Sequence, residues 1–260
     1  MCVTSAKALL TSTYVGAWEI EHPTYGYRHV LAYQNAPQNL AEGPNCMLLH
    51  VPAAAPILPE HLLDTADCPD LLRQMTRQLL ANYSRSNIVP QQIFVVEMGV
   101  YHVVLLNEKS EAGLTAALEQ IPVEKRPHLA PELLNFYAEQ FPDYPLVLAC
   151  FNNRDSHNAS PIMLHYQPIH ADYLFYNLLE GHDGGVPVLD QTIQRHQTII
   201  AGSNRLDAWK EEPKKFNYPG VPEHLLPFLP TVGATQELVG DAPNGDGVVN
   251  LSSTTLSLNF

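Results

Sequence analysis

The chain has 260 residues, of which 45% are hydrophobic, so it is long enough to bury a full core in one large domain or two small ones. It carries 14 basic residues against 27 acidic ones, a formal net charge of -13. Non-specific nucleic-acid binders and proteins that bind anionic membranes need a basic surface, so we expect neither nucleic acid nor membrane as a partner.

The cysteines and the N-terminal sequence indicate a cytoplasmic protein. The four cysteines lie far apart in the chain, with no C-x-x-C pair, which favours reduced thiols over a disulfide framework. Only a short apolar run follows Lys7 before Thr11, which is too short for a signal peptide. No apolar run approaches the roughly 18 residues of a membrane span, so we expect no transmembrane helix.

The first half of the chain is predicted to contain mostly strands. β-Branched and aromatic residues predict strands at 2–15, 28–35, 45–51, 93–98 and 101–106. We expect the first three to pair as an antiparallel sheet, with a turn at 21–26 joining the first two. A glycine at position 99, followed by Val100, predicts a two-residue hairpin turn. Leucine and methionine at helical spacing predict a helix at 69–82 with a core-facing stripe.

The second half is predicted to alternate between helices, short strands and loops. Helices are expected at 111–120 and 131–141, and strands at 146–151, 162–166, 198–201 and 248–258. Residues 181–185 and 244–247 read as a loop and a turn, and proline-rich residues 203–230 as irregular. We therefore predict an α+β fold with mainly antiparallel sheets and segregated helices, or an α/β sandwich. No linker divides the chain, so residues 1–260 are expected to form a single domain.

Cys2 is the sharpest chemical signal in the sequence. A small second residue allows Met1 to be removed, which would leave Cys2 with a free amine beside its thiol. That amine can act as the general base for the thiol, as in N-terminal nucleophile hydrolases. Arg28, Asn35 and Asn153 are the predicted catalytic partners, stabilising an oxyanion or a substrate carboxylate. Two alternatives remain: an ordinary small residue after methionine, or a lipidation site.

Histidines provide a second candidate site. His165, His170 and His182 lie in one part of the chain, and Asp183 follows the last of them. Such side chains can bind zinc or iron, although their spacing matches no H-E-x-x-H motif. The alternative is that each is a surface histidine or a hydrogen-bonded core residue. Apart from this zinc or iron hypothesis, no cofactor is expected.

Nearly the whole chain resembles an uncharacterised family of proteins that begin Met-Cys. The resemblance rests on four segments: Pro44-Asn45-Cys46-Met47, Pro122-Val123-Glu124-Lys125-Arg126-Pro127, His182-Asp183-Gly184 with Pro187, and Pro243-Asn244-Gly245-Asp246. It implies one structural unit and no particular activity. At Cys2 the chain is also similar to the choloylglycine hydrolases and class II glutamine amidotransferases. The amidotransferases continue with glycine where this chain has Val3, and residues 14–24 lack the Arg and Asp of the choloylglycine group.

Three functional hypotheses follow, and the sequence leaves open whether the protein is an enzyme. The first is a cysteine hydrolase or amidase that attacks an amide or ester of a small molecule or peptide through Cys2. The second is a non-catalytic interaction or structural protein that binds a protein partner or assembles as a homo-oligomer through exposed strand edges. The third is a metal-dependent enzyme that uses the His/Asp group.

Overall fold

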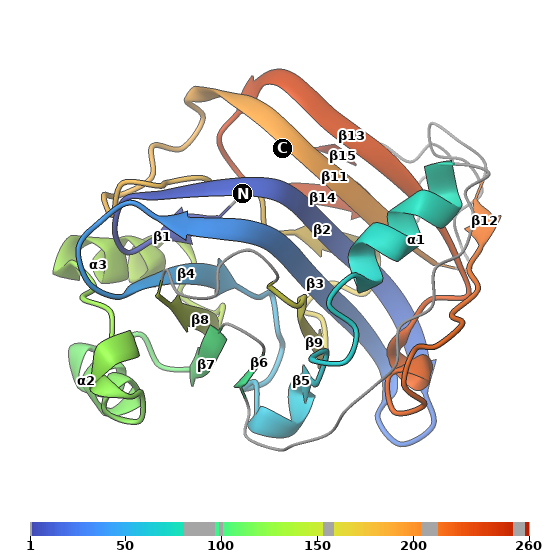
Figure 1. Cartoon of the computed structure of the whole chain (residues 1–260), viewed down its shortest axis with the longest axis horizontal. Helices are drawn as coiled ribbons and strands as arrows, with labels where there is room; N and C mark the ends of the chain where they lie inside the picture. Colours follow the sequence, from blue (N-terminus) through green and yellow to red (C-terminus); the bar gives the residue numbers. More distant parts are fainter. Residues whose placement is uncertain are drawn as a thin grey trace.

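Two large β-sheets share one buried core, and helices lie on their outer faces (Figure 1). The computed structural model describes residues 2–80, 97–98, 101–152, 159–203, 213–251 and 258–259. The described strands pair antiparallel, except that β11 also pairs parallel with β2. The α+β fold with mainly antiparallel sheets is thus confirmed.

The larger sheet has seven strands and the second has five. The larger runs in the order β12 (Lys214–Lys215), β13 (Val232–Pro243), β11 (Thr192–Gly202), β2 (Ala8–His22), β3 (Gly26–Asn39), β9 (Ile162–Tyr166) and β5 (Leu62–Leu63). The five-stranded sheet runs β1 (Val3–Thr4), β4 (Asn45–His50), β8 (Leu146–Phe151), β7 (Tyr101–Leu106) and β6 (Glu97–Met98). A three-stranded sheet contains β10 (Tyr173–Tyr176), β14 (Gly247–Asn250) and β15 (Leu258–Asn259).

Alternating side chains divide the interior into layers. On β4, Met47 and Leu49 belong to the cluster between the sheets, whereas Cys46 and Leu48 face the helices α2 (Glu111–Glu119) and α3 (Pro131–Gln140). The side chains of a strand alternate between its two faces, so β4 is buried on both and reads as a continuous apolar run. On the opposite side, α1 (Leu71–Leu80) packs against the larger sheet, where Trp18 shares its apolar cluster.

Short 3₁₀ turns and loops complete the described fold. They occupy Pro59–His61, Val123–Lys125 and Leu226–Phe228. Within the described part of 203–230, β12 and the turn at Leu226–Phe228 are the regular elements. None of the described helices is both long and apolar enough to cross a bilayer.

Several sequence predictions need correction. The expected first strand is broken into β1 and the much longer β2, which bulges between Thr11 and Tyr14, where Ser12 has φ 52°. The strand at 45–51 does not join the first two strands, because β4 pairs with β1 and β8 in the other sheet. Strand β11 begins six residues before the expected residue 198, at Thr192, and β10 and β13 were not predicted. The hairpin turn at 99–100 lies outside the described residues.

Candidate functional site

The N-terminal segment lies between a loop on one side and β4 on the other. The Thr4 amide donates to the Gly181 carbonyl at 2.7 Å, and the Ala8 amide donates to the His182 carbonyl at 2.9 Å. On the other side, the Asn45 side chain accepts from the Ser5 hydroxyl and the Ala6 amide, each at 3.0 Å. The segment therefore joins the edge of the five-stranded sheet to residues 181–183 by main-chain bonds.

Cys2 is a core residue in this arrangement. Its side chain is 0% exposed and belongs to the cluster between the two sheets. Burial raises the pKa of the thiol to about 12, although a hydrogen bond from the Tyr33 hydroxyl opposes part of this effect. The thiol is therefore almost entirely protonated in this conformation.

Asn35 lies close to Cys2, but Arg28 does not. The Asn35 amide donates to the Tyr33 hydroxyl at 3.5 Å, and its oxygen accepts from the Tyr101 hydroxyl at 3.0 Å. Arg28 lies near the opposite end of β3, about 23 Å from Asn35 at the usual strand rise. There it lies over the Tyr25 ring, 6.0 Å from the ring centroid. Asn153 falls outside the described residues.

The four residues predicted to bind a metal do not form one cluster. His165 packs against Phe228, with ring centroids 4.8 Å apart, and His170 packs against Tyr173 at 6.1 Å. His182 follows Gly181, whose carbonyl accepts a hydrogen bond from Thr4 of β1. The backbone of Asp183 forms an isolated antiparallel β-bridge with that of Lys7. Within the described ranges, no group of three or more His, Cys, Asp or Glu side chains is placed to hold a metal ion.

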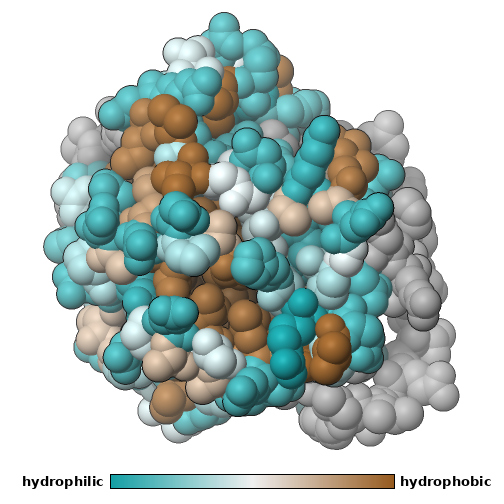
Figure 2. Space-filling view, turned by 90° about the vertical axis from the view of Figure 1, so that its left-hand side faces the viewer, coloured by the Kyte–Doolittle hydropathy of each residue, from teal (hydrophilic) through white to brown (hydrophobic). Residues whose placement is uncertain are grey.

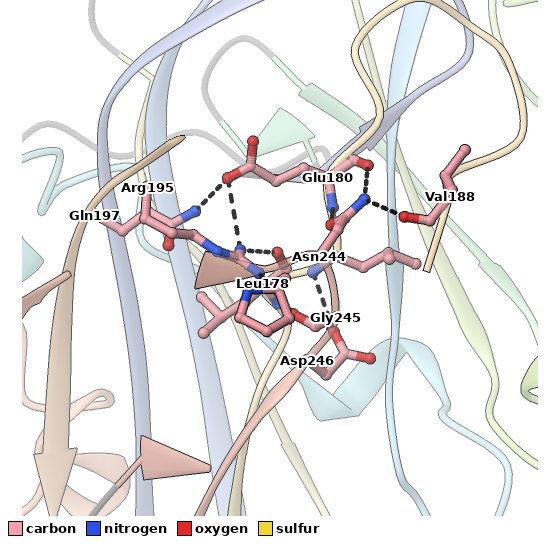
Figure 3. Close-up of polar contacts among 10 residues, drawn as sticks. Leu178, Glu180, Val188, Arg195, Gln197, Asn244, Gly245 and Asp246 are labelled. Carbon is pink, nitrogen blue, oxygen red and sulfur yellow. Dashed lines mark hydrogen bonds and ion pairs between the residues drawn. The ribbon is translucent and has the colours of Figure 1, made fainter. Parts of the chain in front are cut away.

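A buried ion pair lies next to the N-terminal segment (Figure 3). Arg195 Nη1 lies 3.5 Å from Glu180 Oε1, and the two side chains are 1% and 11% exposed. Gln197 donates a further hydrogen bond to the same carboxylate oxygen at 2.8 Å. Burial raises the pKa of Glu180, and the Arg195 charge opposes this rise. Arg195 also donates to the carbonyls of Leu178, Pro243 and Gly245, which ties β11 to two other segments.

Asn244 and Asp246 extend this network through a turn. Asn244 accepts from the Glu180 amide at 2.8 Å, and its amide group donates to the carbonyls of Glu180 at 2.8 Å and Val188 at 3.1 Å (Figure 3). Asp246 accepts from the amides of Leu178 and Leu179, and its second oxygen lies 2.5 Å from His50 Nε2. Side chains of the turn thus provide hydrogen-bond partners for backbone amides and carbonyls that lie outside the strand pairings.

The network supports an exposed hydrophobic loop, residues 186–189, which we call the apolar loop. Val186 is 45% exposed, Val188 60% and Leu189 38%. The residue between the valines, Pro187, is buried and packs against Gly181. In Figure 1 the segment leading into β11 lies on the upper left of the molecule, and Figure 2, which shows the left-hand side, has hydrophobic side chains among hydrophilic ones.

The main chain on both sides of the apolar loop is fixed. Gly184 has φ 83°, and a Cβ there would lie 2.6 Å from the Ser5 carbonyl oxygen, so only glycine fits this close approach. At the other end, the Asp190 amide donates to the Asn244 carbonyl at 2.9 Å, and Asp190 itself has φ 60°. The loop therefore leaves and rejoins the fold at two well-defined points.

The sequence pointed to the loop and the turn that flank this network, but not to the ion pair within it. The His182-Asp183-Gly184 loop and the Pro243–Asp246 turn were noticed as separate segments, and the structure places them together around Asn244. Glu180, Arg195 and Gln197 were not predicted. Arg195 and Gln197 lie in a continuous polar run of β11, which reads as a solvent-exposed segment, and Glu180 lies outside the strands and carried no signal.

Comparison with known proteins gives only distant structural likenesses. No protein-family model matches the chain, and no curated protein matches it. A crystal structure of baculovirus P35 is similar with a TM-score of 0.48 and 10% identity, covering 99% of this chain and 94% of that one. A mutated baculovirus P35 after caspase cleavage has a TM-score of 0.44 and 10% identity, covering 92% of this chain and 97% of that one. Likenesses of this size carry no inference about function.

Proposed function

We propose that this chain is a non-catalytic interaction protein whose apolar loop docks into a hydrophobic cleft of a partner protein. The observation that carries the proposal is the run of exposed Val186, Val188 and Leu189 above a buried polar network. Exposed aliphatic side chains on a backbone fixed from beneath are typical of a surface that is ready to bind.

Pre-organisation is the physical reason that such a loop binds well. A flexible loop loses conformational freedom on binding, at a cost of roughly 0.5–1.5 kcal/mol for each immobilised side chain, with further cost for the backbone. Here Asn244 holds the Val188 carbonyl, and buried Pro187 fixes the backbone between the two valines. Much of the ordering cost is therefore met during folding rather than on association.

Charge indicates the chemistry of the partner. Exposed Asp183 and Asp190 flank the apolar loop, and the whole chain carries a net charge of -13. A partner cleft with an apolar floor and a rim of lysine or arginine would complement both features. Association should accordingly be faster at low ionic strength, because salt screens attraction between exposed charges.

Site-specific photo-crosslinking tests this proposal. A benzophenone amino acid replaces Val188 in the full chain, and the protein is illuminated in a lysate of the organism that makes it. We expect one discrete protein adduct, which weakens at high salt and is lost when Val186→Ser and Leu189→Ser are added. The matched control carries the same group at Leu226, which is 42% exposed and lies in the turn that packs against the Trp18 end of β2.

Two results would overturn the interaction function. The first is the absence of a discrete adduct at position 188, or the same adduct from position 226. The second is substrate turnover by the purified protein that Cys2→Ala abolishes. Far-UV circular dichroism of each variant separates lost binding from lost folding.

The cysteine hydrolase remains as a second candidate because Tyr33 and Asn35 lie beside Cys2. For this activity Met1 would have to be removed, and the thiol would have to be exposed and deprotonated. Intact mass gives the first test, followed by labelling of the native protein with a thiol probe. A retained Met1, or a Cys2 that reacts only after denaturation, would eliminate this candidate.

A further inference from the structure

A pocket of about 370 Å³ has largely aromatic walls. Its lining residues are Pro52, Tyr144, Pro168, His170, Tyr173, Phe175 and Val248. Tyr173 and Phe175 are alternate residues of β10 and therefore point to the same side of the strand. A bridge between Ala53 and Pro168 brings the two proline segments together beside them.

The rings around the pocket stand nearly at right angles to one another. Tyr144 and Phe175 have centroids 6.1 Å apart and an interplanar angle of 87°. His170 and Tyr173 have the same separation and an angle of 76°. Rings that lie in different planes allow the faces of different rings to line different walls of a pocket. The negative face of each ring attracts a cation that approaches within about 6 Å.

Charges near the pocket also favour a cation. None of the lining residues is lysine or arginine, so an anion would find no fixed positive charge in the lining. Burial raises the pKa of Tyr144, and the negative charges of Asp246 and Asp143 raise it further, so these two carboxylates lie close enough to act on this wall. Lys109 also lies near Tyr144, and its ammonium group donates to the carbonyls of Pro142 at 2.9 Å and Tyr144 at 2.7 Å. The His50 ring, 6.1 Å from that of Tyr144, is paired with Asp246.

We propose that this pocket binds a trimethylammonium group, with its methyl groups against Tyr144, Tyr173 and Phe175. Such a group has no N–H to donate, so it needs no hydrogen-bond acceptor in the lining. Its charge is spread over methyl groups, which lose little hydration when they contact aromatic rings. The group could belong to a free choline-like molecule or to a trimethyllysine side chain, and the two sources share this recognition.

Isothermal titration calorimetry of the full chain with choline tests the proposal, with 3,3-dimethyl-1-butanol as the uncharged compound of the same shape. We expect choline to bind with a Kd below about 1 mM and the neutral compound to bind at least about tenfold more weakly. A peptide carrying trimethyllysine forms the second arm, and the tighter of the two charged probes identifies the source. Equal affinity for choline and its neutral analogue, or no binding of either charged probe, would overturn the proposal.

Two substitutions at Tyr173 separate ring chemistry from pocket shape. Tyr173 is 42% exposed, so both variants should fold. Tyr173→Phe keeps the ring face and should bind choline within about twofold of the original affinity, whereas Tyr173→Leu should lose about tenfold. Equal binding by the two variants would mean that the ring face contributes nothing, which contradicts the proposal.

Discussion

His165 is a buried base held in its neutral form. Its side chain is 0% exposed, and its ring lies 4.8 Å from that of Phe228 and 4.9 Å from that of His61. Burial, and then the neighbouring His61, lower its pKa to about 4. An unfolded histidine has a pKa near 6.5, so between these values the unfolded chain binds a proton that the native chain does not.

Stability should therefore fall as the pH falls from about 6.5 to about 4. The contribution of His165 is on the order of 1–3 kcal/mol, and His182, whose burial also lowers its pKa to about 4, acts in the same direction. Glu180 acts in the opposite direction, because burial raises its pKa. His165→Phe keeps an aromatic ring without a titrating group, so urea unfolding at pH 7 and pH 4.5 should show a smaller acid loss for this variant.

The control for this prediction is His196→Gln, which removes an exposed histidine from β11. It should leave the difference between the two pH values nearly unchanged. If His165→Phe loses as much stability on acidification as the original protein, neutral His165 is not the cause.

At the scale of elements, the junction between the N-terminal segment and the loop rests on one glycine. Gly184 and Gly220 have nearly the same backbone conformation, φ 83° and φ 78°, but different surroundings. A Cβ on Gly184 would meet the Ser5 carbonyl oxygen at 2.6 Å, whereas a Cβ on Gly220 would meet nothing within 4 Å. Alanine at Gly220 would therefore add backbone strain alone, whereas alanine at Gly184 would add backbone strain and a steric clash.

Gly220→Ala should cost about 1–2 kcal/mol, the penalty for a left-handed backbone with a side chain. Gly184→Ala should cost about 1–3 kcal/mol more, because the main chain around Ser5 must also shift. Urea midpoints measure both values. Hydrogen exchange at Thr4 and Ala8, whose amides donate to the carbonyls of Gly181 and His182, should rise only in Gly184→Ala. Equal costs for the two variants would contradict the close contact.

The sequence located a strand accurately where its buried side chains are apolar, and missed it where they are polar. Strands β4 and β8 were located well because both faces are apolar, which leaves a continuous hydrophobic run. The first part of β11 was missed because its inward positions include Arg195 and Gln197, which are buried but polar. Their hydrogen bonds reach segments far away in the chain, and local periodicity contains no information about such partners.

The candidate site shows the same limit. Cys2 and Asn35 stand out for their chemistry, and packing between the two large sheets places both beside Tyr33. Arg28 was chosen because it begins the neighbouring strand, yet in the antiparallel pair it lies opposite Ile20, far from the N-terminal segment. The direction and register of pairing decide which end of a strand meets a site, and residue types do not specify them. The exposed Val186, Val188 and Leu189 gave no sign that their backbone was fixed.

At the scale of the whole molecule, one core connects the three sheets. The central cluster includes Leu31 of the seven-stranded sheet, Met47 of the five-stranded sheet and Val249 of the three-stranded sheet. Each of these side chains loses its apolar surroundings if a neighbouring sheet separates, at a cost of roughly 1.5–3 kcal/mol for each large residue. Separation would expose many such residues together. We therefore predict that the chain unfolds as one cooperative unit, as expected of a single domain.

Two probes on opposite sides of the core test this prediction. Trp18 is 0% exposed, reports on the seven-stranded sheet, and becomes the only tryptophan when Trp209→Phe is introduced. Hydrogen exchange of Val147 and Ala149 in β8 reports on the five-stranded sheet. With rising urea, Trp18 fluorescence should change at the same midpoint at which the β8 amides lose protection. Loss of β8 protection at clearly lower urea would show that the five-stranded sheet and its helices open independently, and that the shared core does not couple the two sheets.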